Sequence, residues 1–369
     1  MKQLLGLRLA ELADDLAELG QPRYRATQVF EWVYRRLQPD FARMSSLPRE
    51  LRATLAERYD AHVVAPIHVA RADDGLTEKA LLELAPPAER LLAGPLGERR
   101  RRFNSVESVL MIYPGARVRR TVCVSSQAGC AMACEFCATG QSGFVRDLSA
   151  GEIVGQVLHF ARRVRQIDGP DARLTNLVFM GQGEPFMNFE NVWRAVELLT
   201  APEAFGLGAR HITLSTVGVV PAIRELARRP LQVNLAVSLH AADDRLRSEL
   251  VPLNRKYPLG EVLTAVREYV RATKRRVSFE YACIGGVNDS PSDAAKLADL
   301  VGGMLCHVNL IPFNPVAGSP FRPPAPGRVE AMAALLKRRG VPTTIRDTRG
   351  RQIDAACGQL RARVLRDSA

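Results

Sequence analysis

The chain has 369 residues, of which 47% are hydrophobic and 24% are charged, as in an ordinary globular protein with a sizeable core. No apolar run approaches the length of a transmembrane helix, which excludes a helical membrane protein. Lys and Arg number 51 against 39 Asp and Glu, and the net charge of +12 is typical of proteins with an anionic partner such as nucleic acid. A generally basic proteome would explain this charge equally well.

Residues 1–60 are predicted to form helices. Acidic residues from Glu11 to Glu18 interrupt the first apolar run, which excludes a signal peptide and favours a cytoplasmic protein. In the following stretch QPRYRATQVFEWVYRRL we expect Phe30 to lie in a small core. Arginines of this stretch that lie outside the core are candidates for contacts with RNA phosphates. The helical leucines are Leu5, Leu9, Leu12, Leu16 and Leu19, and the candidate arginines are Arg23, Arg25, Arg35 and Arg36.

A β-hairpin is predicted next, with strands HVVAPIHVA and LTEKALLELA joined by the turn ADDG. Residues 85–102 are rich in Pro, Gly and Arg and are expected to form an exposed insertion or linker. From residue 104 apolar strands alternate with helices, which indicates a parallel sheet covered by helices. The expected strands are VESVLMIY, RRTVCVSS, LTNLVFMG, HITLSTVG, QVNLAVSLH, VSFEYACI, HVNLIPFNP and PTTIRD.

Small or polar residues recur where four of these strands end. Because ligands bind at the carboxyl ends of parallel strands, this recurrence favours a barrel with a site at its mouth. The residues are Gly181 to Glu184, Ser215 with Thr216, Ser238 with Leu239 and His240, and Asn314.

Three of the seven cysteines lie close together as Cys130, Cys134 and Cys137, in a C-x3-C-x2-C spacing with Phe136 beside the last. Cytoplasmic thiols stay reduced, so the spacing indicates metal binding or catalysis. Structural zinc needs a fourth ligand, and the nearest further cysteine is Cys123. A four-iron cluster on three cysteines leaves one iron free to bind the amino and carboxylate groups of a small molecule. Both readings remain open at this point.

The cysteine spacing resembles that of radical S-adenosylmethionine (SAM) enzymes. The segments CVSSQAGCAMACEFCATG, FMGQGEPFMN, HITLSTVGVVP, LAVSLHA, LIPFNP and IDAACGQL are similar to those of the RlmN type of RNA adenine C2-methyltransferases, whose close relative is the C8-methylating Cfr enzyme. The resemblance implies an α/β fold, a partial (β/α)6 radical-SAM barrel with a small N-terminal helical accessory domain and a short β extension. The expected boundaries are 1–60 for the helical domain, 61–115 for the extension, 116–350 for the barrel and 351–369 for the C-terminal tail.

The resemblance also implies the chemistry. Cys130, Cys134 and Cys137 would hold a [4Fe-4S] cluster, and two SAM molecules would be used per turnover. Cys357 would carry the methyl group, and Cys123 would resolve the enzyme–RNA adduct and leave a Cys123–Cys357 disulfide. Proton removal from carbon 2 falls to the Cys123 thiolate or to Glu107, which matches the family's proton acceptor. The implied SAM contacts are Gly183, Glu184, Ser215, Ser238, Leu239, His240 and Asn314.

The implied partners are 23S rRNA, an adenine next to a tRNA anticodon, and an electron-donor protein such as flavodoxin; we expect a monomer. Arg99 to Arg102 and the terminal RARVLR are further candidates for RNA contact, whereas Cys283 and Cys306 are expected in the core. Three alternatives remain: a Cfr-like C8 methyltransferase, another radical-SAM enzyme, and a zinc-bearing RNA-binding protein without catalysis.

Overall fold

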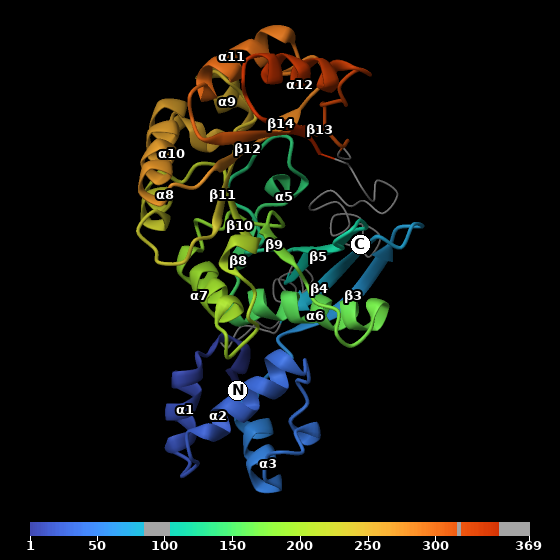
Figure 1. Cartoon of the computed structure of the whole chain (residues 1–369), viewed down its shortest axis with the longest axis vertical. Coiled ribbons are helices and arrows are strands. Elements are labelled where there is room, and N and C mark those ends of the chain that lie inside the picture. Colours follow the sequence, from blue (N-terminus) through green and yellow to red (C-terminus); the bar gives the residue numbers. More distant parts are fainter. Residues whose placement is uncertain (85–103, 316–318, 347–369) are drawn as a thin grey trace, which may run out of the picture. The chain divides into compact units, whose positions relative to one another are not determined.

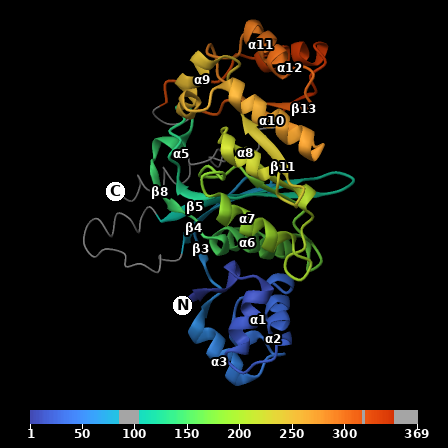
Figure 2. The same ribbon diagram turned by 90° about the vertical axis from the view of Figure 1, so that its left-hand side faces the viewer.

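A computed structural model describes residues 1–84, 104–315 and 319–346. The chain divides into two compact units. Figures 1 and 2 show the helices and strands, coloured along the sequence. The first consists of Met1–Ala128, Asp147–Val178 and Asn188–Ile212, and the second of Gly129–Arg146, Phe179–Met187 and Thr213–Ala369. No helix within the described ranges is long and apolar enough to cross a membrane.

The first unit begins with the predicted helices. Their elements are β1 (Lys2–Gln3), α1 (Leu9–Ala17), α2 (Tyr24–Phe30), which continues as a π-helical turn (Glu31–Arg35), α3 (Arg49–Arg58) and β2 (Tyr59–Asp60). Strands β1 and β2 pair in parallel. Phe30 is buried and its ring lies 5.0 Å from that of Tyr34, which confirms the expected small core. Two of the candidate arginines form surface ion pairs, Arg23 with Asp14 and Arg36 with Glu31.

The sheet of the first unit has the strand order β3-β4-β5-β6-β9. Its strands are β3 (Val64–Arg71), β4 (Thr77–Leu84), β5 (Ser105–Tyr113), β6 (Arg119–Cys123) and β9 (Asn176–Phe179). The predicted hairpin β3–β4 is confirmed, and β6 and β9 are parallel as expected. The prediction of parallel strands from residue 104 onward is wrong for β5 and β6, which are antiparallel. The loop between them is too short for a parallel crossover.

Two helices flank β9 along the chain of the first unit, α6 (Ala150–Asp168) before it and α7 (Phe189–Thr200) after it. The predicted start of α6 is confirmed by a capping box, in which Ser149 Oγ accepts from the Glu152 amide and Glu152 Oε2 accepts from the Ser149 amide. Helix α6 contacts β3 and β6, and its apolar face is buried.

The second unit is a run of parallel strands in chain order, β10 (Ile212–Thr216), β11 (Asn234–Ser238), β12 (Val277–Cys283), β13 (Cys306–Pro312) and β14 (Thr343–Ile345). The helices between them are α8 (Val220–Leu226), α9 (Asp244–Leu250), α10 (Leu259–Thr273), α11 (Pro291–Val301) and α12 (Arg328–Arg338). Each neighbouring pair is parallel and the order is open, so the described strands form no closed barrel. The expectation of a mixed α/β fold with a partial barrel is confirmed.

Candidate functional site

The second unit brings together the strand ends that the sequence singles out. Because its strands are parallel, their carboxyl ends share one edge of the sheet. Ser215 lies at the end of β10, Ser238 at the end of β11, and Asn314 just after β13. Gly183 and Glu184 belong to the segment Phe179–Met187 of the same unit. The predicted cofactor contacts therefore come from one edge of one unit.

Glu184 is a buried carboxylate held by the backbone. Its Oε1 accepts from the Phe186 amide at 3.0 Å and its Oε2 accepts from the Val217 amide at 2.8 Å. Burial raises the pKa of Glu184 to about 7, against the opposing effect of these hydrogen bonds and one from Thr216. Gly183 next to it has φ +95, a left-handed conformation that side chains rarely adopt. The carboxylate is thus fixed in position to accept from an ammonium group.

We expect SAM binding to weaken in acid because of this carboxylate. Above about pH 7 Glu184 is ionised, and below it protonation removes the negative charge that the predicted contact with the ammonium group of SAM requires. Lowering the pH from about 7.5 to about 5.5 should therefore raise the Kd for SAM by about tenfold or more. Equilibrium dialysis of the anaerobic, cluster-loaded protein measures this Kd. Glu184→Gln should bind weakly at both pH values, and an equally steep pH dependence in that variant would contradict the role of Glu184.

The three predicted cluster cysteines lie in one loop, between β7 (Gln127–Gly129) and β8 (Phe144–Asp147). The Cys130 amide donates to the carbonyl of Gly143 at 2.9 Å and closes the loop. Gly129 permits this closure, since a Cβ there would lie only 2.0 Å from the Gly143 oxygen. The loop geometry thus depends on a glycine directly before the first cysteine.

Two of these thiols, Cys130 and Cys134, respond to the charges of their neighbours. The pKa of Cys130 is raised to about 12, first by burial and also by Cys137 and Glu184, against a backbone hydrogen bond from Met132. Burial also raises the pKa of Cys134, with added effects of Cys137 and Cys130. Thiols that oppose one another's ionisation fit a site where a bound metal compensates the negative charge. No three His, Cys, Asp or Glu side chains of the described ranges are already arranged as metal ligands, so the cysteine side chains would have to turn toward a cluster.

An apolar shell surrounds the cysteine loop. Cys134 is part of a buried cluster with Leu250, Ile284 and Phe313, against which Cys137 and Phe136 pack. The Phe136 ring contacts the His240 ring edge-on at a centroid distance of 4.5 Å. Phe136 thus joins the cysteine loop to the end of β11, and the shell lowers the local dielectric constant.

His240 is buried in a left-handed conformation with φ +61. Burial lowers its pKa to about 3, with a further effect of Arg247, so the ring is neutral. Its Nδ1 accepts from the Ala282 amide at 3.0 Å, which leaves the proton on Nε2. His240 can therefore offer a hydrogen-bond donor, as expected of a residue that faces a cofactor.

Arg247 is a buried residue that the sequence gives no signal for. Its side chain donates to the carbonyls of Leu239 at 3.0 Å, Val217 at 2.6 Å and Ser238 at 3.2 Å, and to Asn254 Oδ1 at 2.7 Å. These hydrogen bonds hold the segments that follow β10 and β11 next to each other. Burial lowers its pKa to about 10, and Cys134 acts in the opposite direction. A negatively charged cluster on Cys134 would compensate this cation.

The remaining predicted catalytic residues of the described ranges, Cys123 and Glu107, lie in the first unit. Val109 of β5 is directly opposite Cys123 of β6, and Glu107 is two residues from Val109. Side chains two apart point to the same face of a sheet, so Glu107 and Cys123 share one face. Cys123 is half-buried, and Glu107 is 2% exposed.

Lys79 on β4 is a further residue of this face that sequence reasoning missed. Its Nζ lies 2.6 Å from Glu107 Oε2, and its side chain is fully buried. Lys79 is opposite Val109 in the register, which places it on the face that carries Glu107 and Cys123. This buried ion pair holds the Glu107 carboxylate in one orientation. In the sequence, the position of Lys79 two residues from both Thr77 and Leu81 in a predicted strand is the signal that places it on their face of the sheet.

Several expectations fall outside the described residues: the methyl carrier Cys357, Arg99 to Arg102 and the terminal RARVLR. Cys283 and Cys306 are buried in β12 and β13, which confirms their assignment to the core.

Comparisons with known proteins show which families this chain matches. Residues 124–298 match the family model of the radical SAM superfamily, and residues 2–60 match that of the ribosomal RNA large subunit methyltransferase N-terminal domain. Two proteins with the name probable dual-specificity RNA methyltransferase RlmN cover 98% of this chain. One, from Frankia casuarinae, is 50% identical and matched over 83% of its length. The other, from Roseiflexus castenholzii, is 46% identical and matched over 96%.

The comparison extends to solved structures. The crystal structure of a radical SAM methyltransferase from Sphaerobacter thermophilus is 49% identical to this chain. It matches with a TM-score of 0.89 over 97% of this chain and 99% of that one. The similarity thus covers the N-terminal helices as well as the parallel strands.

Proposed function

Because the chain belongs to the RlmN family of dual-specificity RNA methyltransferases, we propose that it methylates carbon 2 of an adenine in 23S rRNA and of an adenine next to a tRNA anticodon. It is a radical SAM enzyme, and its superfamily implies a [4Fe-4S] cluster and SAM as cofactors. The observation that carries the proposal is the edge of the second unit, where three closely spaced thiols lie in one loop and the buried Glu184 acts on Cys130 and Cys134. Membership of the family excludes a zinc protein without catalysis.

The cluster and SAM would supply a radical that can attack an unreactive carbon, which ordinary methyl transfer cannot. Cys130, Cys134 and Cys137 would hold the cluster. Glu184 would accept from the SAM amino group, with Gly183, Ser215, Ser238, Leu239, His240 and Asn314 as further contacts. These assignments are supported by the shared strand edge, the fixed Glu184 carboxylate and the neutral His240.

The cysteines of the chain would carry the methyl group. Cys357 would take a methyl group from a first SAM and present its carbon to adenine after a second SAM has generated the radical, so that two SAM are used per turnover. After the radical adduct has given up one electron, Cys123 would attack the Cys357 sulfur, the bond from that sulfur to the transferred carbon would break, and the carbon would take up a proton to become the methyl group. A Cys123–Cys357 disulfide would remain. Glu107, or the Cys123 thiolate itself, would take the proton from carbon 2. The shared sheet face of Glu107 and Cys123 supports this pairing of roles.

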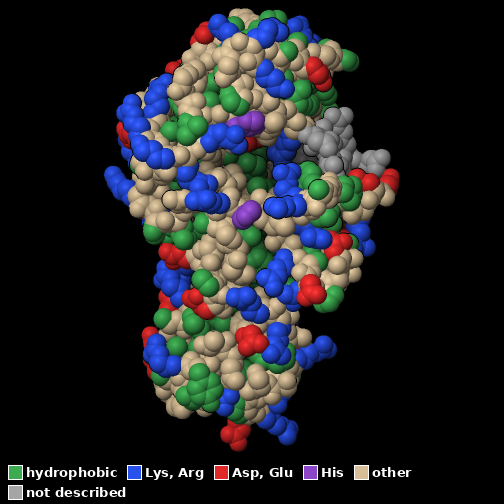
Figure 3. Space-filling model, in the orientation of Figure 1, with side chains coloured by type: hydrophobic (Ala, Val, Ile, Leu, Met, Phe, Trp, Pro, Cys, Tyr) green, Lys and Arg blue, Asp and Glu red, His purple; other side chains and the backbone are tan. Residues whose placement is uncertain are grey.

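We also propose a cytoplasmic monomer that receives electrons from a protein such as flavodoxin. The proposed domains are 1–60, 61–115, 116–350 and 351–369, and the match of residues 2–60 to a family model of their own supports the first boundary. The net charge of +12 supports an RNA partner, and Figure 3 shows Lys and Arg side chains spread over the face drawn.

Nucleoside analysis tests the position of the methyl group. We expect in vitro turnover with labelled SAM, 23S rRNA and tRNA to give 2-methyladenosine in both RNAs. Mass spectrometry of the digested RNA distinguishes 2-methyladenosine from 8-methyladenosine, and a reaction without SAM serves as the control. Methyl on carbon 8 without carbon 2 would assign a Cfr-like activity in place of the proposed one.

A further inference from the structure

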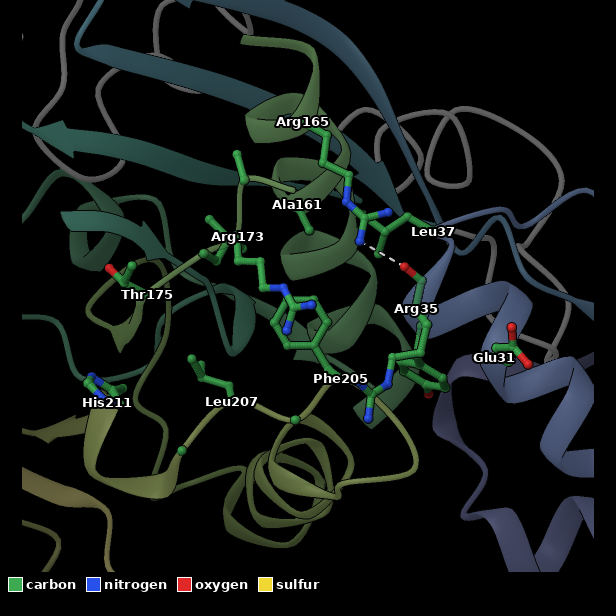
Figure 4. Close-up of a pocket in the computed structure, with 15 residues that line it drawn as sticks. Glu31, Arg35, Leu37, Ala161, Arg165, Arg173, Thr175, Phe205, Leu207 and His211 are labelled. Atoms are coloured by element: carbon green, nitrogen blue, oxygen red, sulfur yellow. Dashed lines mark hydrogen bonds between the residues drawn. The ribbon is translucent and has the colours of Figure 1, made fainter. Parts of the chain in front are cut away.

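The first unit contains a cavity of 660 Å³ that the proposed reaction does not use (Figure 4). Four parts of the chain line it: the π-helical turn after α2, the second half of α6, the loop before β9 and the loop after α7. Its volume lies in the range of sites for small ligands. The residues that matter are Arg35, Arg165, Arg173, His211 and Phe205. All belong to the first unit, whereas the predicted cluster and SAM contacts belong to the second.

The cavity has an excess of positive charge. Figure 4 shows Arg35, Arg165 and Arg173 around one hollow, with Glu31 at its margin. Glu31 binds Arg36 at 2.7 Å and is therefore engaged elsewhere. Within the described part of the chain, none of the three cavity arginines forms an ion pair with a carboxylate. A cluster of cations without acidic partners is a site for an anion.

Backbone carbonyls orient two of these arginines without neutralising them. Arg165 donates to the carbonyl of Arg35 at 2.8 Å, and Arg35 itself donates to the carbonyl of Pro202. Burial lowers the pKa of Arg165, and nearby Arg173 lowers it further against the effect of Asp171. Arg165 and Arg173 are thus close enough to repel each other, and an anion between them would relieve that repulsion.

The walls of the cavity suit a nucleotide better than a bare phosphate. Phe205 is half-buried and Leu207 is buried, and both line the cavity beside the arginines. An aromatic ring beside guanidinium groups can stack on a base or ribose while the cations bind the phosphate. Such a combination is typical of proteins that bind single-stranded or unpaired RNA.

We propose that the cavity around Arg35, Arg165, Arg173 and His211 binds a phosphodiester of the substrate RNA, together with the nucleotide attached to it. This inference rests on the proposed RNA substrate and adds a binding site that lies outside the predicted cluster and SAM contacts. Of the candidate arginines in the N-terminal stretch, Arg35 is the one that lines this cavity, whereas Arg23 and Arg36 form ion pairs.

Arg173→Glu in the full-length, cluster-loaded protein tests the site. Arg173 is exposed, so reversing its charge leaves the fold intact, which a thermal melt verifies. We expect the Kd for tRNA to rise by about tenfold or more, and the slope of log Kd against log salt to fall by about one. KM for tRNA should rise with kcat and SAM affinity unchanged. Arg173→Lys keeps the charge and should retain most of the affinity.

Arg271→Glu is the matched control, because it makes the same charge change at an exposed arginine of α10 in the second unit. If it weakens tRNA binding as much as Arg173→Glu does, the effect is general charge and the site is wrong. Unchanged tRNA binding by Arg173→Glu overturns the site while the proposed function stands. A wild-type protein that binds no RNA refutes the proposed function as well.

Adenosine monophosphate distinguishes RNA from a free nucleotide. Titration of the wild-type protein with this nucleotide alone should give binding at least about a hundredfold weaker than tRNA, since a single phosphate makes few of the contacts. Binding as tight as that of tRNA and lost in Arg173→Glu would assign the cavity to a free nucleotide and overturn the proposal.

Discussion

The Cys357→Ala variant is expected to transfer no methyl group to adenine. In the proposed mechanism the Cys357 sulfur carries the methyl carbon, because carbon 2 of adenine is too electron-poor to attack SAM directly. The cluster cysteines lie elsewhere in the sequence, so iron and sulfide content should match the wild-type protein. Labelled SAM followed by nucleoside analysis measures the methylation, and elemental analysis of anaerobic protein measures the cluster.

Cys306→Ala is the matched control for this variant. Cys306 is buried in β13 and belongs to the core, so its replacement removes a thiol without removing a predicted catalytic group. We expect it to lower the free energy of unfolding by about 1 kcal/mol and to keep methylation. Residual methyl transfer to adenine by Cys357→Ala would refute the role of Cys357 as carrier.

The Cys123→Ala variant is expected to form the enzyme–RNA adduct but not to release it. The expectation rests on thiol–disulfide chemistry, because in the proposed mechanism a second thiol must attack the Cys357 sulfur to release the product. Cys123 is a half-buried thiol on the same sheet face as Glu107. Protein purified from cells should therefore carry covalently bound RNA. A denaturing gel shows this as a shifted band that collapses on treatment with ribonuclease.

The double variant Cys123→Ala, Cys357→Ala is the control for cross-linking. It lacks the carrier thiol, so no adduct can form and the band should not shift. A shifted band in the double variant would mean that the RNA is attached through another residue. Absence of any shifted band in Cys123→Ala alone would show that Cys123 does not resolve the adduct.

Local sequence signals predicted many elements of the fold correctly. The capping box at Ser149 places the start of α6, and the turn ADDG joins β3 and β4, because caps and tight turns depend on a few neighbouring residues. The parallel strands β10 to β14 follow from apolar segments that alternate with helices. Alternation failed at β5 and β6, where the short loop after Tyr113 permits only an antiparallel pair.

Contacts between distant parts of the chain could not be predicted in this way. A buried Arg247 reads in sequence as one more arginine of a polar helix, yet it holds carbonyls at the ends of two strand segments. Lys79 and Glu107 are 2.6 Å apart only because β4 and β5 pair in one register. The cavity that Arg35, Arg165 and Arg173 line forms only because segments far apart in the sequence lie side by side in the fold.

The sequence by itself determined the chemical inventory of this protein: the spacing of Cys130, Cys134 and Cys137, the basic charge, and the polar residues that end the strands. These properties depend on residue type and spacing alone, so they can be determined without knowledge of the fold. Only the tertiary structure decided which charges are neutralised and which are left to bind a partner. A charge is paired when an oppositely charged side chain from another strand or helix lies next to it. The separation of two residues in the sequence does not show whether their side chains come together in the fold.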